Sequence, residues 1–166
     1  MLVFDVLKAE HSHIKDLLAR MEATAGRATN SRSELYDCLR HDFLSDSEAE
    51  ERIFYGALSD SPEMSELVGW AREDHAIGLY LLDALGAVAP DTEEWMAAVK
   101  TLKDNVELHI DGEEGELFRR ARSLLSRKDA QTMAPGRSRL PHLRTPNPPM
   151  ISVPTRSEET HSSTVG

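Results

Sequence analysis

Long apolar runs and paired cysteines are missing from this chain of 166 residues. No stretch approaches the roughly 20 apolar residues that a membrane-spanning helix needs, so none is predicted and no membrane partner is expected. The first residues hold acids and histidines where a secretory signal would need a basic start, so export by that route is not expected. The single cysteine, Cys38, has no internal disulfide partner, which fits a cytoplasmic protein.

Basic residues are outnumbered by acidic ones, 19 to 29, and aromatic residues are scarce. The net charge is −10, and no basic stripe of the kind that follows a phosphate backbone is present, so nucleic acid is not expected as a partner. Aromatic residues make up only 5% of the chain, and the alternation of apolar and polar residues that marks a strand is almost absent. The composition therefore predicts an all-α protein.

Four segments carry apolar residues at helical spacing. They cover residues 5–25, 31–57, 62–88 and 91–126, with Asp5 as the expected cap of the first and Asp91 or Thr92 as that of the last. Helices of this length joined by short loops predict an up-down-up-down antiparallel four-helix bundle over residues 1–130. Residues 131–166 hold six of the eight prolines and many Ser, Thr and Arg residues, which predicts a disordered tail and a candidate arm for a partner protein.

Polar residues interrupt the apolar row of every predicted helix. Counting the rise per residue from each loop places these residues at similar heights, with the last two helices offset by about one turn. The residues on these rows are His11, Asp46, Glu50, His75, His109 and Glu113. Asp46 and Glu50, like His109 and Glu113, are four residues apart, so each pair leaves one face of its helix.

A shared metal ion would explain why these groups lie on apolar faces, because an unpaired buried carboxylate costs several kcal/mol. Imidazole and carboxylate ligands without thiolate favour iron or manganese over zinc. Glu50 and Glu113 on facing helices can bridge two ions, which predicts a dinuclear site. A buried polar network without metal remains an alternative.

The chain resembles the hemerythrin-like domains of the HHE cation-binding family. The resemblance runs over about 1–127, through EHSHIKDLL with His11, EAEERIFYGAL with Glu50, EDHAIGLYLLDAL with His75 and LHIDGEEGELF with His109 and Glu113. It implies two non-haem iron ions joined by an oxo or hydroxo bridge, with His11, His75, His109 and Asp46 as terminal ligands and Glu50 and Glu113 as bridges.

Three positions depart from the family pattern. Asp46 stands where the family has a histidine on the second helix, which favours Fe(III) or weakens the binding of one iron. Leu79 stands where oxygen-carrying hemerythrins have a second histidine on the third helix. Gly56 replaces a usual proline. Counting ligands leaves more than one coordination position open, which suits peroxide, nitric oxide or oxygen.

The leading functional hypothesis is a cytoplasmic di-iron protein that binds O2, NO or peroxide and handles or senses oxidative or nitrosative stress. Whether such a protein turns over peroxide or NO is left open. Iron storage or delivery without catalysis and a metal-free helical interaction module are the alternatives. A ferritin-like oxygenase would need Glu-x-x-His on two helices, and only the outward-facing His13 fits. Glu51 and Glu114, each next to a ligand, are candidates for supporting or replacing it.

Overall fold

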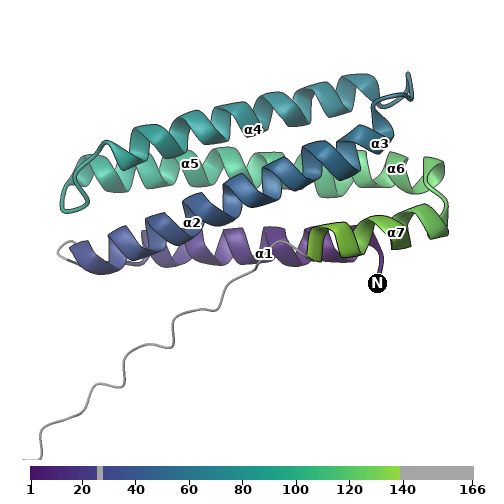
Figure 1. Cartoon of the computed structure of the whole chain (residues 1–166). Coiled ribbons are helices and arrows are strands. Elements are labelled where there is room, and N and C mark those ends of the chain that lie inside the picture. Colours follow the sequence, from purple (N-terminus) through teal and green to yellow (C-terminus); the bar gives the residue numbers. More distant parts are fainter. Residues whose placement is uncertain (26–27, 139–166) are drawn as a thin grey trace, which may run out of the picture.

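Helices make up the regular structure of the computed structural model, which describes residues 1–25 and 28–138 and holds no strand in those ranges (Figure 1). This confirms the all-α prediction. The elements in chain order are α1 (Val3–Glu22), α2 (Thr29–Ala49), the π-helical turn η1 (Glu50–Tyr55), α3 (Gly56–Leu58), α4 (Ser65–Gly86), α5 (Glu93–Gly112), the π-helical turn η2 (Glu113–Leu117), α6 (Phe118–Leu124) and α7 (Arg127–Ser138).

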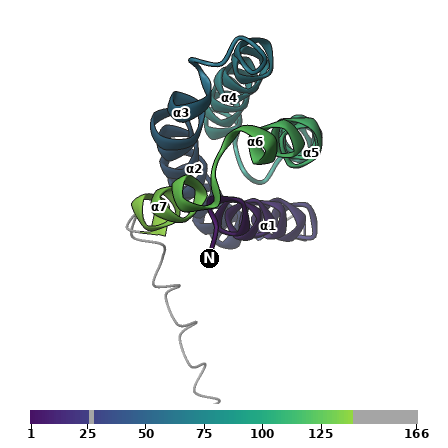
Figure 2. The same cartoon turned by 90° about the vertical axis from the view of Figure 1, so that its right-hand side faces the viewer.

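Four long rods lie side by side and form the body of the molecule. The segments α2, η1 and α3 follow one another without a break and form one rod, and α5, η2 and α6 form another (Figure 1). The rod of α1 packs against α2 and α5, and α4 packs against α5 and α2. Figure 2, which looks along the rods, shows them around a common interior. Each predicted helix corresponds to one rod.

The helix ends differ in detail from those predicted. Helix α1 begins at Val3 rather than at Asp5, and the Asp5 carboxylate instead accepts a hydrogen bond of 2.8 Å from the Leu2 backbone N–H. Thr92 is confirmed as the cap of α5, since its hydroxyl accepts a 3.2 Å hydrogen bond from the Trp95 backbone N–H. Ends of this kind fray easily, and the rows of inward residues are unaffected.

Helix α7 corrects the prediction that disorder begins at residue 131. It packs on α1 and η1 and buries Ala130 and Ala134, whose small side chains allow a close approach (Figure 2). Ser126 and Asp129 cap it reciprocally, each accepting a 3.2 Å hydrogen bond from the other's backbone N–H. The predicted domain end at residue 130 therefore falls inside a helix. Residues 139–166 of the predicted tail lie outside the described residues.

The buried apolar side chains form two clusters, one toward each end of the rods. The amino-terminal cluster gathers residues near the start of α1, and the opposite cluster gathers residues near its end. The amino-terminal cluster includes Phe4, Leu7, Phe54, Tyr55, Val68 and Phe118, and the opposite cluster includes Leu18, Phe43, Leu82, Trp95 and Val106. Between them each rod contributes buried polar residues, so a polar layer crosses the bundle.

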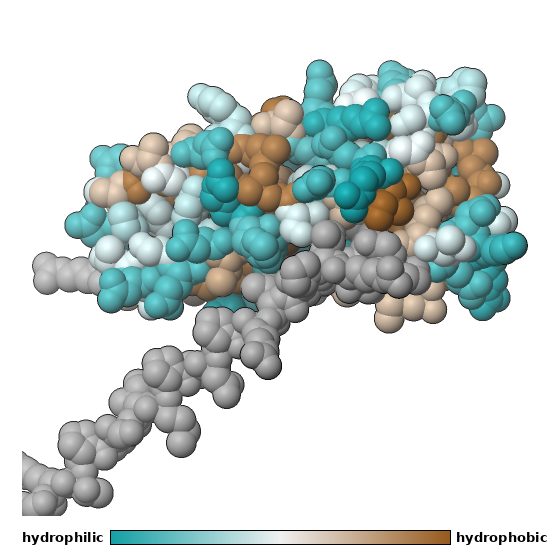
Figure 3. Space-filling view, in the orientation of Figure 1, coloured by the Kyte–Doolittle hydropathy of each residue, from teal (hydrophilic) through white to brown (hydrophobic). Residues whose placement is uncertain are grey.

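The surface carries mainly hydrophilic side chains. Figure 3 shows one face on which smaller hydrophobic patches are separated by hydrophilic residues. Within the described ranges, no helix combines the length and the apolar character that crossing a bilayer requires.

Candidate metal centre

The polar layer contains two triads of potential metal ligands that share one carboxylate. His11, Glu50 and Glu113 form the first, and Glu50, His75 and His109 form the second. Within each triad the potential ligand atoms all lie within 4.8 Å of one another. All five residues are buried, and the most exposed, His109, has only 7% of its surface accessible.

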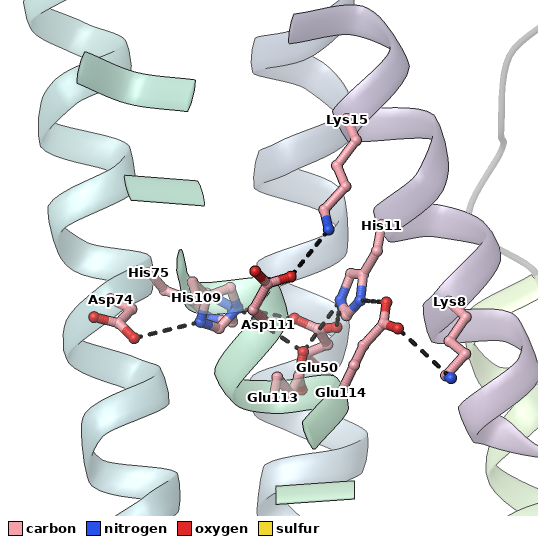
Figure 4. Close-up of polar contacts among 10 residues, drawn as sticks. All are labelled: Lys8, His11, Lys15, Glu50, Asp74, His75, His109, Asp111, Glu113 and Glu114. Atoms are coloured by element: carbon pink, nitrogen blue, oxygen red, sulfur yellow. Dashed lines mark hydrogen bonds and ion pairs between the residues drawn. The ribbon is translucent and has the colours of Figure 1, made fainter. Parts of the chain in front are cut away.

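In the first triad, the Nε2 atom of His11 faces both carboxylates. It lies 3.3 Å from Oε1 of Glu50 and 3.1 Å from Oε2 of Glu113. The residues come from α1, η1 and η2, so three different rods meet at this point (Figure 4). One nitrogen donor and two oxygen donors are thus directed at a single small space.

In the second triad, the other oxygen of Glu50 is used. Oε2 of Glu50 lies 3.1 Å from Nε2 of His75, and the same nitrogen lies 3.1 Å from Nε2 of His109. Glu113 reaches toward this side as well, since its Oε2 is 3.9 Å from Nε2 of His109. The two carboxylates therefore stand between the histidines of both triads, as groups that bridge two cations would.

The carboxylate of Glu113 is the clearest sign that this layer fits a cation. Both of its oxygens are buried without a hydrogen-bond partner, and the nearby Nε2 of His11 is not aligned for a hydrogen bond. A buried carboxylate in this condition is costly unless a cation compensates its charge. The nitrogen and oxygen donors present are those that iron accepts, so the residues fit a pair of iron ions.

Each histidine of the two triads has a carboxylate at its other ring nitrogen, and Figure 4 shows those beside His11 and His109. The Nδ1 atom of His11 is hydrogen-bonded to Glu114 at 2.9 Å, and that of His75 to Glu51 at 3.3 Å. The Nδ1 atom of His109 lies 3.6 Å from the Asp74 carboxylate. An acid at this position makes Nδ1 the protonated nitrogen, so Nε2 is left with a free lone pair for a metal.

Protonation in the centre reflects burial and charge together. Burial alone would lower the pKa of His11, but the carboxylates of Glu113 and Glu50, both close to its Nε2 atom, raise it well above its usual value. The pKa of His75 is also raised, because the effect of the Glu50 carboxylate is larger than the lowering caused by burial. Burial and the positive charge of His75 lower the pKa of His109 to about 4. In the metal-free protein, protonated histidines thus balance the negative charge of the carboxylates, a role that bound metal ions would otherwise fill.

Burial, followed by the charge of Glu50, raises the pKa of Glu113. Two carboxylates that share a dry space repel each other when both are ionised. A pair of divalent or trivalent cations between them would remove this repulsion, and binding would displace protons from the centre.

Two π-helical turns position the carboxylates of Glu50 and Glu113. Glu50 begins η1 and Glu113 begins η2, and each is followed directly by the glutamate that contacts a histidine Nδ1 on another rod. Such turns interrupt α-helices frequently at functional sites. The two rods therefore use a Glu-Glu pair in the same way. The first glutamate of each pair faces the centre, and the second contacts the Nδ1 atom of a histidine.

An aromatic ring follows Glu50 and Glu113 by five residues each, and it stacks on the histidine that the second glutamate of the pair contacts. The ring of Tyr55 lies 5.5 Å from that of His75, and the ring of Phe118 lies 6.2 Å from that of His11. In an α-helix, residues five apart diverge by about 140° around the axis. In a π-helical turn the hydrogen bond joins residues five apart, so both leave the same face.

Five of the six predicted site residues meet in the two triads: His11, Glu50, His75, His109 and Glu113. Asp46 is buried on α2 one turn before Glu50, but it belongs to neither triad. Glu51 and Glu114, singled out for their place beside ligands, contact histidine Nδ1 atoms. Sequence reasoning missed Asp74, because its contact with His109 depends on how α4 and α5 are aligned.

Comparison with known proteins identifies the family of the chain. The family model described as the hemerythrin HHE cation binding domain matches residues 2–121, which is most of the chain and contains every residue of the two triads. Neither the curated proteins nor the solved structures gave a significant match.

Proposed function

Because the chain belongs to the hemerythrin HHE cation-binding domain family, we propose that it is a non-haem di-iron protein that binds O2, NO or peroxide. Its role would be to handle or to sense oxidative or nitrosative stress in the cytoplasm. The metal-binding character follows from the family and from the two triads. We further propose that the metal is iron, that two ions bind and that the ligand is one of these small molecules.

The observation that carries this proposal is the position of Glu50. Its two oxygens are divided between the triads, with Oε1 toward His11 and Oε2 toward His75. A site for one ion would direct both oxygens, or one of them, at a single set of donors. A carboxylate shared in this way suits two neighbouring cations, with Glu113 as the second bridge.

In the proposed centre His11, His75, His109 and Asp46 act as terminal ligands. An iron pair, when bound, supplies the electrons for chemistry with a small oxidant. The chain's own residues orient and enclose it: Glu114, Glu51 and Asp74 fix the histidine rings, and the two apolar clusters exclude water. Asp46 is the least supported of these ligands, since it lies outside both triads.

We take the four rods to be an up-down-up-down antiparallel bundle. Support comes from the loops between successive rods, which are short and lie at alternating ends in Figure 1. In this topology the inward rows of all four rods reach one level, which is the requirement for a site built from every rod.

Metal content and absorption test the proposal. Protein from iron-replete cells should hold about two iron ions per chain and show an oxo-to-iron charge-transfer band in the near ultraviolet. The substitution Glu50→Gln should remove most of the iron, because it affects both triads. Glu48→Gln, on the exposed face of the same rod, is the matched control and should leave the iron unchanged.

Fewer than about one iron per chain in the wild-type protein, or the absence of the charge-transfer band, would contradict the proposal. Equal iron content in Glu50→Gln and Glu48→Gln would contradict the assignment of Glu50 as a bridge.

A further inference from the structure

The hydroxyl group of Tyr55 is buried and has no hydrogen-bond partner within the described residues. Its side chain is completely inaccessible to solvent. Unsatisfied polar groups in such positions are rare and costly, because the group loses its hydrogen bonds to water without replacement. A phenylalanine would fill the same space without that cost.

The tyrosine side chain is directed at the metal centre. The turn η1 brings it to the same face as Glu50, and its ring stacks on His75 at 5.5 Å. The phenol therefore lies beside the proposed metal centre, with a hydroxyl group that has no hydrogen-bond partner among the described residues.

Phe118 provides an internal comparison. It follows Glu113 by five residues, stacks on His11, and is as deeply buried as Tyr55. The two halves of the centre are thus alike in their Glu-Glu pairs and in having a stacked ring, and the two stacked rings differ by one hydroxyl group. Packing needs only the ring, so the hydroxyl on the His75 side calls for another explanation.

We propose that Tyr55 donates a hydrogen bond to the small molecule that binds at the metal pair, which places the binding subsite on the His75 side. This inference rests on the proposed function for the presence of the metal ions. The ligand class is a small molecule with a hydrogen-bond-accepting atom, such as peroxide, oxygen or nitric oxide. Azide, a stable anion of similar size, serves as the probe.

The experiment compares iron-loaded, oxidised wild-type protein with Tyr55→Phe by azide titration, followed through the azide-to-iron charge-transfer band. We expect equal iron content and at least about tenfold weaker azide binding in the variant, since one hydrogen bond to an anion is lost. The azide stretching frequency should shift between H2O and D2O in the wild-type protein and not in Tyr55→Phe.

Tyr36→Phe is the matched control. Its hydroxyl donates a 3.0 Å hydrogen bond to the Leu82 backbone carbonyl, outside both triads. This variant should bind azide as the wild type does. In the metal-free proteins, Tyr36→Phe should lower the thermal unfolding midpoint, whereas Tyr55→Phe should leave it equal or raise it, because no hydrogen bond of the folded chain is lost.

Equal azide affinity in wild type and Tyr55→Phe would overturn the inference alone. So would a visible phenolate-to-iron band that disappears in Tyr55→Phe, because the tyrosine would then be a ligand. An unfolding midpoint lowered as much as in Tyr36→Phe would assign the hydroxyl a structural role instead. Wild-type protein without a pair of irons would overturn the proposed function and this inference together.

Discussion

At the residue scale, the centre is defined by which atom of each side chain faces inward. Every histidine of the triads presents Nε2 to the carboxylates and Nδ1 to an acid on a neighbouring rod. The acid fixes the ring and increases the basicity of the nitrogen that faces the metal. Glu114 itself is held by Lys8, whose Nζ lies 3.6 Å away.

Replacing Glu114 by glutamine should therefore weaken metal binding without altering the ligand set. We expect a loss of roughly 10–100-fold in affinity, because the amide holds His11 less firmly and polarises it less. Glu116→Gln is the control: this residue is near in sequence but is paired with Arg119 and Arg120. Competition with a chelator of known affinity measures both variants, and equal affinities would contradict the assigned role of Glu114.

Metal uptake at neutral pH should release protons. The pKa of His11 is raised well above its usual value, because Glu113 and Glu50 outweigh burial, so in the metal-free protein His11 keeps a proton that a metal must displace. Metal affinity should accordingly fall as the pH is lowered. His109, with a pKa of about 4, is already neutral and contributes little.

Calorimetry in two buffers that differ in ionisation enthalpy measures this proton release. A binding enthalpy that is the same in both buffers at pH 7 would contradict it.

The rows of inward residues made most of this centre predictable. Periodicity alone identified the histidines and the bridging glutamates, because one rise and one rotation per residue fix which side chains share a face. The relative heights were less certain: counting left His75 and His109 about a turn apart, whereas their Nε2 atoms lie 3.1 Å apart. The contact between Asp74 and His109 depends on how two rods are aligned, and the spacing of residues within one helix does not give that alignment.

At the element scale, the π-helical turns are the feature that the sequence did not reveal. With regular α-helical geometry Tyr55 lies about 140° from Glu50 and would be assigned to another face. The turn η1 brings the two together, and η2 does the same for Glu113 and Phe118. Each of these two rods thus gains an extra inward side chain next to Glu50 or Glu113.

Helix α4 offers a test of how tightly the centre is enclosed. A Cβ atom added at Gly78 would lie 2.5 Å from the ring of Phe43, which packs edge-on against His75. Gly78→Ala should therefore displace that ring and cost about 1–3 kcal/mol of unfolding free energy. Gly69→Ala, on the same helix with nothing within 4 Å, should instead stabilise by about 0.5–1 kcal/mol.

Denaturant unfolding of the two variants gives the comparison. Stabilisation by Gly78→Ala equal to that by Gly69→Ala would show that the Phe43 ring moves freely, contrary to the close packing seen here.

At the scale of the whole molecule, the four rods are completed by α7. This helix covers the amino-terminal cluster, where Ala130 is buried and Met133 packs against it. The change in composition after residue 130 concealed it, because prolines and serines outweigh two alanines in any average over the tail. The reciprocal cap of Ser126 and Asp129 was the local signal that could have revealed the helix.

A chain that ends at Ser126 should be less stable than one that ends at Ser138. Loss of α7 exposes apolar surface of α1 and η1, for which we expect about 2 kcal/mol and a thermal midpoint several degrees lower. Scanning calorimetry of the two chains measures the difference. Equal midpoints would mean that α7 rests on the bundle without stabilising it.

The position of the polar layer between two apolar clusters affects how fast ligands and metal ions enter and leave it, as well as the stability of the protein. Its side chains are at most 7% accessible, and aromatic rings lie against two of its histidines. A diatomic gas can diffuse through small fluctuations of a packed interior. A hydrated ion or a bulky chelator can reach the centre only when the rods separate locally. If the centre holds iron as proposed, the bound ion should leave on the timescale of local unfolding, even where its equilibrium affinity is modest.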